Sequence, residues 1–206
     1  MEQRSDERRL TTIVTADVVG FTRLMSEDET GTLAALKAYR KELIEPKIAQ
    51  YNGRTVKLMG DGALMEFGSV VDAVHFAVEV QIAMQERNAS VPDNRQIVYR
   101  IGTNIGDIIV EGSDIYGEGV NLAARLEALA EPGGICVARN VYNQVKGKLD
   151  LNFEYLGDKT VKNIPDPVPV YQVVLDEKAE GLVTDLRPDV SPHRSQLPFA
   201  VASVIF

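Results

Sequence analysis

Cysteine is nearly absent from this chain, which has 206 residues and a single thiol, Cys136. One cysteine excludes an intrachain disulfide, and this sparse use of cysteine is typical of a reducing compartment. Long apolar runs are missing too: the late run 199–206 is far shorter than the roughly 20 residues that span a bilayer. Together these shortages predict a cytoplasmic location and no membrane insertion in this chain.

Basic side chains are outnumbered by acidic ones. The sequence holds 22 Lys and Arg against 30 Asp and Glu, which gives a formal net charge of −8. This balance argues against a general nucleic-acid binder. It does not exclude an anionic ligand, because charges beyond about 8 Å are screened and local lysines, arginines and metals decide that question.

The apolar content is sufficient for one domain of ordinary size, since 45% of the residues are hydrophobic. The charged residues 1–9 predict a solvated lead-in, residues 10–176 the domain, and the polar, proline-containing stretch from 177 a linker. The terminal run 199–206 has the composition of a strand with nothing after it. It predicts the start of a further domain in a longer natural protein, beyond Phe206.

Apolar runs with strand character alternate with stretches of helical periodicity. The predicted strands and helices, in chain order, are strand 11–18, a helix ending at 52–53, strands 54–59 and 63–67, a helix from Ser69, and strand 96–110. This βαββαβ order is the ferredoxin-like arrangement, an α+β fold with a mainly antiparallel sheet and helices on one face. A short helix at 120–129 and strands at 135–138, 152–156 and 168–174 are additions. Gly102 and Gly106 inside a strand indicate a bulge or the close approach of another backbone.

Gly60-Asp61-Gly62 lies between the two central strands and is a β-hairpin signal that places Asp61 at an exposed tip. On this stretch alone, a turn-forming role is the better explanation of Asp61. Asp17 favours a functional role for Asp61, because Asp17 lies near the end of strand 11–18 and precedes the glycine turn 20–22. Two carboxylates on neighbouring strand ends can hold divalent cations against a triphosphate.

Asn121 and Arg125 are four residues apart on the predicted helix 120–129 and therefore project from one face of it. An exposed polar face is the ordinary explanation for such a pair. Their neighbours are mostly apolar, and a narrow polar stripe on an apolar helix favours a stripe that faces a ligand or partner.

Four stretches together resemble the catalytic domain of class III nucleotidyl cyclases, the family of adenylate and guanylate cyclases. They are ADVVGFT at 16–22, KLMGDG at 57–62, RIG at 100–102 and DIYGEGVNLAAR at 114–125, in the family's order. Each motif alone is weak, but the set is highly specific and spans about residues 10–175. The resemblance implies a bacterial adenylate cyclase that converts ATP to 3′,5′-cyclic AMP and pyrophosphate.

In similar enzymes, one subunit supplies the metal and phosphate ligands. The resemblance assigns two Mg²⁺ or Mn²⁺ ions to Asp17, Asp61 and the backbone carbonyl of Val18. It assigns the backbone N–H groups around Phe21 and Thr22 to the phosphates, with Arg100 beside them.

The second subunit would supply the remaining contacts. Lys57 and Asp114 would bind the adenine edge, Asn121 the ribose, Arg125 the transition-state phosphate and Lys162 the triphosphate. One copy then completes neither site, so the resemblance implies a head-to-tail homodimer with two sites.

A donor at Lys57 and an acceptor at Asp114 suit adenine N1 and its 6-amino group. Guanine presents the reverse pattern, and guanylate cyclases of the family usually carry a glutamate and a small polar residue there.

Two positions depart from the family pattern: Lys162 is followed by Asn163 instead of glycine, and Asn104 stands where relatives often have histidine. The alternatives are a guanylate cyclase and a non-catalytic, nucleotide-binding cyclase-like dimerisation module; a diguanylate cyclase lacks support because its Gly-Gly-acidic hairpin differs from Gly60-Asp61-Gly62.

Overall fold

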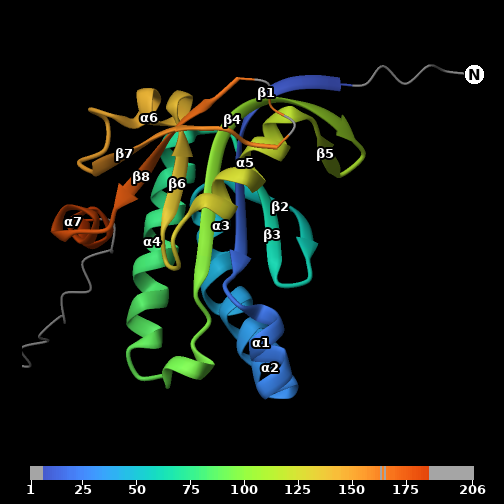
Figure 1. The fold of residues 1–206 in the computed structure, drawn as a ribbon, viewed down its shortest axis with the longest axis vertical. Helices are drawn as coiled ribbons and strands as arrows, with labels where there is room; N and C mark the ends of the chain where they lie inside the picture. The colour runs from blue at the N-terminus through green and yellow to red at the C-terminus, as the bar shows by residue number, and fades with distance from the viewer. Residues whose placement is uncertain (1–6, 163, 165, 186–206) are drawn as a thin grey trace, which may run out of the picture.

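The computed structural model describes residues 7–162, 164 and 166–185 (Figure 1). Its strands are β1 (Glu7–Val18), β2 (Gly53–Met59), β3 (Gly62–Phe67), β4 (Tyr99–Glu111), β5 (Asp114–Tyr116), β6 (Ile135–Ala138), β7 (Asn152–Lys159) and β8 (Val168–Val174). Its α-helices are α1 (Phe21–Glu27), α2 (Glu29–Tyr39), α3 (Glu45–Gln50), α4 (Val70–Asn88), α5 (Glu118–Leu129), α6 (Arg139–Val145) and α7 (Glu177–Asp185). A π-helical segment, Arg40–Ile44, joins α2 to α3, and a 3₁₀ turn, Asp93–Arg95, precedes β4.

The strands form one sheet in the order β2-β3-β1-β4-β6-β8-β7, with β5 paired to β4. The first four strands reproduce the ferredoxin-like order, and every neighbouring pair among them is antiparallel. Only the pairing of β4 with β6 is parallel within the described sheet. The predicted α+β fold with additional C-terminal strands is therefore confirmed.

The two faces of the sheet carry different helices. Val14, Met65 and Ile101 belong to the main core with the helical layer of α2, α3 and α4, as the predicted one-sided packing requires (Figure 1). Ile13 instead belongs to a second cluster with Ala123 of α5, because adjacent strand residues point to opposite faces. Helix α5 thus covers the face that the sequence interpretation left bare.

The interior glycines of β4 make room for α5. A β-carbon on Gly102 would lie 2.2 Å from the Ala123 carbonyl oxygen, and one on Gly106 would lie 2.6 Å from the Gly119 α-carbon. The predicted close approach of another backbone is confirmed, and it fixes α5 tightly across β4.

Several boundaries differ from the sequence interpretation. Residues 7–9 pair with β4 as part of β1, so the lead-in is shorter than 1–9. Asp114 begins β5, a short strand that is absent from the predicted strands. The predicted linker starts with helix α7, whose Ala179 and Val183 are buried in the main core, so the packed unit passes residue 176. The proposed strand 199–206 and the further domain lie outside the described residues.

The helical segment between β1 and β2 begins at Phe21, directly after the glycine at position 20. Ser26 already lies inside α1, where its hydroxyl donates to the Thr22 carbonyl, and Asp28 caps α2 by accepting from the Gly31 N–H at 2.9 Å. Pro46 lies at the start of α3, directly after the π-helical segment. Within the part of the chain that the structure describes, no helix is long and apolar enough to cross a membrane.

Candidate active site

The carboxyl end of β1 brings two acids together. Asp17 stands opposite Arg100 in the β1–β4 ladder, and Ala16 stands opposite Ala63 in β3, one residue after the hairpin turn. This register places the Asp61 carboxyl within hydrogen-bonding reach of Asp17. The structure therefore joins two side chains that are 44 positions apart in the sequence, at the rim of one sheet.

The pKa of Asp17 is raised from its ordinary value. Burial is the largest cause, and the charge of Asp61 and a hydrogen bond with it act in the same direction. Arg100 opposes them: its Nη2 lies 3.7 Å from Asp17 Oδ2 and lowers the pKa. A pair of carboxylates held this close gains from any cation that enters between them.

Glu127 joins this group, although the sequence interpretation did not single it out. Its Oε1 lies 4.0 Å from Arg100 Nε, and its side chain is only 15% exposed. Burial first, then the charges of Asp17 and Asp61, raise the pKa of Glu127 to about 7, while Arg100 opposes the rise. The glycine at position 102 indicates from sequence that another backbone approaches β4. Only the structure shows that this backbone is the turn of α5 at Glu127.

The raised pKa of Glu127 predicts a pH-dependent stability of the metal-free protein. Glu127 has an ordinary pKa of 4.5 and a folded-state pKa of about 7, so between these values the folded state holds more protons than the unfolded state. The free energy of unfolding should fall as pH rises through this window. Glu127→Gln should remove this contribution and be more stable than wild type at pH 8 by on the order of 2 kcal/mol.

Urea unfolding in EDTA at pH 5, 6.5 and 8 measures this difference, with the exposed Glu131→Gln as the matched control. A Glu127→Gln advantage that is the same at pH 5 as at pH 8 would contradict the assignment.

The loop after Asp17 leads straight into a helix. Gly20 has φ 65° and caps α1, a left-handed conformation that glycine adopts readily, so Phe21 and Thr22 form the first helical turn. No side chain of the described residues caps this terminus. The first N–H groups of a helix have no partner within it and can receive anionic oxygens. The Val18 carbonyl ends β1 just before this turn.

A second group of polar side chains lies on β2 and on the neighbouring strand β5. Lys57 Nζ lies 2.9 Å from Asp114 Oδ2, and this carboxylate also accepts from the Tyr116 hydroxyl at 3.0 Å. The hydrogen bond with Asp114 raises the pKa of Lys57, and the bond with Lys57 lowers that of Asp114. Arg54 in β2 donates to the Ser113 carbonyl at 3.0 Å, which holds the β4–β5 turn against β2. A donor and an acceptor thus stand side by side, with the Lys57 side chain 50% exposed and the Asp114 side chain 23% exposed.

Asn121 and Arg125 lie one turn apart on α5, as the sequence predicts. Asn121 is exposed, whereas the Arg125 Nε is buried and has no hydrogen-bond partner among the described residues. A buried guanidinium nitrogen without a partner is costly. It marks the Arg125 Nε as a donor that lacks an acceptor among the described residues.

The two groups remain separate within one chain. No hydrogen bond or ion pair of the described residues links Lys57, Asp114 or Arg125 to Asp17 or Asp61. Lys162 lies in the segment between β7 and β8, is exposed, and has no such bond within the described part of the chain. The candidate side chains thus fall into two groups that no hydrogen bond or ion pair of the described residues connects within one chain.

The donor set at Asp17 fits magnesium or manganese. The described residues contain no cluster of three or more His, Cys, Asp or Glu side chains that could hold a metal. Mg²⁺ is usually held by one or two carboxylates together with substrate phosphates and water, because it gives up its waters reluctantly. Two converging carboxylates and a strand-end carbonyl match that requirement.

A ferredoxin-like sheet with paired acids at the hairpin edge, an arginine beside them and a separate donor–acceptor pair defines a nucleotide cyclase-type catalytic domain. The profile of the family described as "Adenylate and Guanylate cyclase catalytic domain" matches residues 4–175. The chain belongs to this family, and the resemblance found in the sequence is confirmed.

Known relatives agree with this assignment. The chain is 47% identical over 171 residues to "Putative adenylate cyclase 3" of Rhizobium meliloti, a match that covers 83% of the chain and 29% of that protein. A solved adenylate/guanylate cyclase/hydrolase from Silicibacter pomeroyi is 48% identical, with a TM-score of 0.79 over 84% of this chain and 100% of that one. The adenylyl cyclase CyaB from P. aeruginosa is 26% identical, with a TM-score of 0.72 over 82% and 96%. The chain thus spans under a third of the curated Rhizobium relative.

Proposed function

We propose that this chain is an adenylate cyclase domain, which forms 3′,5′-cyclic AMP and pyrophosphate from ATP at the interface of a head-to-tail homodimer. The observation that carries the proposal is the division of the candidate residues into a paired-acid group and a Lys57–Asp114 group. The adenylate cyclase names of two relatives support the same activity.

In this proposal, the paired-acid group holds the triphosphate end. Asp17, Asp61 and the Val18 carbonyl would hold two Mg²⁺ or Mn²⁺ ions, and such ions lower the pKa of the ribose 3′-hydroxyl and neutralise phosphate charge. The first-turn N–H groups at Phe21 and Thr22 would bind phosphate oxygens, and Arg100 would add its charge from β4.

The second copy would bind the nucleoside end. Lys57 would donate to adenine N1 and Asp114 would accept from the 6-amino group, so ATP exchanges their mutual 2.9 Å contact for two contacts with the base. Asn121 would hold the ribose, and Arg125, whose Nε has no partner among the described residues, would direct its guanidinium to the α-phosphate. Lys162 would reach the triphosphate.

The reaction needs little covalent help from the protein. The 3′-oxygen attacks the α-phosphorus in line, the bond to the bridging oxygen breaks, pyrophosphate leaves, and the hydroxyl proton passes to solvent. Positioning and charge stabilisation supply most of the acceleration in such phosphoryl chemistry. This account requires both copies, because the residues that would bind the ribose and the residues that would hold the metal ions come from different chains.

The direct test is to incubate the pure protein with ATP and Mn²⁺ and to measure cyclic AMP, with GTP and cyclic GMP in parallel. Turnover of ATP well above GTP is expected. Preference for GTP would replace the proposal with a guanylate cyclase, and nucleotide binding without turnover by a proven dimer would favour a non-catalytic module.

A cytoplasmic location, proposed from the single buried thiol of Cys136, is tested by cell fractionation.

Base selection makes a separate prediction. Lys57→Glu combined with Asp114→Ser should present an acceptor to guanine N1–H and a donor to O6. The ratio of kcat/KM for GTP to that for ATP is expected to rise by roughly a hundredfold or more, because unpaired polar groups reject the wrong base. Lys37→Glu, at an exposed position of α2, is the control and should leave the ratio unchanged. An unaltered ratio in the double variant would show that this pair does not read the base.

A further inference from the structure

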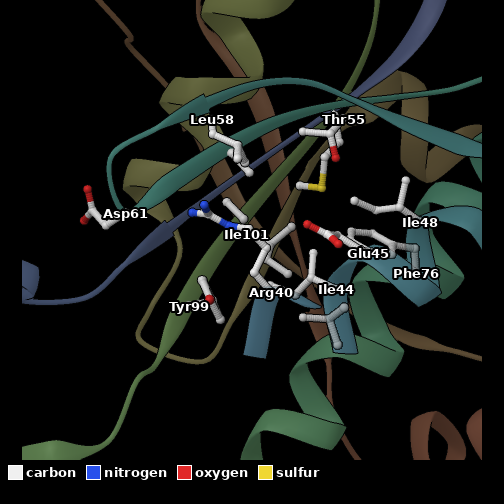
Figure 2. A pocket seen from close by; sticks show the side chains of 14 residues that line it. Arg40, Ile44, Glu45, Ile48, Thr55, Leu58, Asp61, Phe76, Tyr99 and Ile101 are labelled. Atoms are coloured by element: carbon white, nitrogen blue, oxygen red, sulfur yellow. The ribbon is translucent and has the colours of Figure 1, made fainter. Parts of the chain in front are cut away.

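A cavity of about 210 Å³ lies between the sheet and the helical layer, beneath the β2–β3 hairpin (Figure 2). Apolar side chains of the π-helical segment, α3 and α4 form one wall, and Met65 and Ile101 of the sheet form the other. The lining side chains on the helical side are Ile44, Ile48, Phe76 and Val80. A well-packed core rarely leaves a space of this size, since interiors are filled to crystal-like density.

This cavity is separate from the paired-acid group. Ala16 and Ile101 line it, whereas their neighbours Asp17 and Arg100 point to the opposite face of the sheet, where α5 packs. Of the described residues that line the cavity, only Asp61, at the hairpin turn, also belongs to the paired-acid group. A molecule in the cavity would therefore not occupy the space of the nucleotide but would touch the turn that bears Asp61.

Arg40 connects the cavity to that turn. It projects from the π-helical segment, a distortion often found at functional sites, and its Nη2 donates to the Gly60 carbonyl at 3.3 Å. Figure 2 shows its guanidinium extending toward the turn of Asp61. A guanidinium has five N–H donors, so Arg40 can also serve an oxygen atom inside the cavity.

From these contacts we infer that the cavity is a regulatory site for a small, uncharged, largely apolar molecule that carries one hydrogen-bond acceptor. An engineered apolar cavity of about 150 Å³ in another protein binds benzene, so this volume suits a slightly larger aromatic molecule. Charge excludes an acid, because Glu45 and Asp61 border the cavity along with Arg40. The acceptor would bind Arg40, and the apolar body would lie against the isoleucines.

The inferred effect on catalysis rests on the proposed function. An occupant that draws Arg40 from the Gly60 carbonyl loosens the turn that presents Asp61, and one that leaves this bond in place stiffens it. A ligand shifts such an equilibrium only by its differential affinity for the two arrangements. Binding itself does not depend on the cyclase activity and can be measured alone.

The test uses acetophenone as the probe and isopropylbenzene, which has nearly the same shape but no acceptor, as its match. Isoleucine methyl NMR of the wild-type chain should show shifts at Ile44, Ile48 and Ile101, and none at Ile115 in the cluster under α5. Acetophenone should bind about fivefold more tightly than isopropylbenzene, the size of one hydrogen bond. Shifts confined to other methyls, or no saturable shift at all, would overturn the site.

Two variants separate the parts of the inference. Arg40→Met should abolish the preference for acetophenone, while Lys41→Met, on the same π-helical segment but exposed, should keep it. Val80→Phe should fill the cavity and remove binding of both probes; where this variant fails to fold, the wild-type methyl map decides instead. Binding without any effect on cyclic AMP formation would contradict the regulatory role alone, and absence of turnover in the free protein would contradict the proposed function alone.

Discussion

Asp17→Ala and Asp61→Ala are each expected to lower cyclic AMP formation by roughly a thousandfold or more while the fold survives. Each change removes one of the two carboxylates that converge at the rim of the sheet and would hold the metal ions. The fold should survive because burial of Asp17 and the charge of Asp61 beside it both raise the pKa of Asp17, so its charged form is disfavoured in the folded chain. The rate of cyclic AMP formation at saturating Mn²⁺ measures the loss of activity, and the melting temperature measures whether the fold survives.

Asp107→Asn is the matched control, because Asp107 lies in β4 and pairs with Arg8 at the surface. An exposed ion pair contributes little to stability, so this variant should keep both turnover and melting temperature. Full turnover in either Asp17→Ala or Asp61→Ala would refute the metal assignment. A loss of turnover accompanied by unfolding would call for Asp17→Asn, which keeps the side-chain volume.

The core of the fold could be predicted from sequence because its signals are local. The run 11–18 is apolar on both faces, the Gly60-Asp61-Gly62 turn marks the hairpin, and Ser69 caps α4 by accepting from the Asp72 N–H. Two features depend on distant contacts and were missed. Helix α7 is held by the burial of Ala179 and Val183, and α5 lies on the second face of the sheet.

The candidate site was predictable in its residues but not in its arrangement. The motifs name Asp17, Asp61, Lys57 and Asp114, and the predicted strand ends already bring Asp17 close to Asp61. No spacing reveals that Lys57 and Asp114 pair at 2.9 Å within one chain. Glu127 has no local signal at all. Its place beside Arg100 follows from the contact of α5 with Gly102, which is a property of the folded chain.

Mixing two inactive variants should restore activity. Asp17→Ala alone and Arg125→Ala alone are each expected to be almost inactive, the second because an arginine aimed at the transferring phosphorus is worth roughly a thousandfold or more. In a mixed dimer, one site combines both defects. The other combines the intact acids of the Arg125→Ala chain with the intact arginine of the Asp17→Ala chain.

Random assortment of equal amounts makes half of the dimers mixed, each with one working site of two, so about a quarter of wild-type turnover should return. The expected time course follows subunit exchange, with activity rising after mixing at a constant total concentration. Asp61→Ala mixed with Asp17→Ala is the matched control: both changes damage the same group, every site lacks an acid, and no activity should return. If mass spectrometry shows mixed dimers of the first pair that remain inactive, each chain must act through residues of its own. The separation of Arg125 from Asp17 within the chain would then be bridged by a rearrangement instead of by a partner.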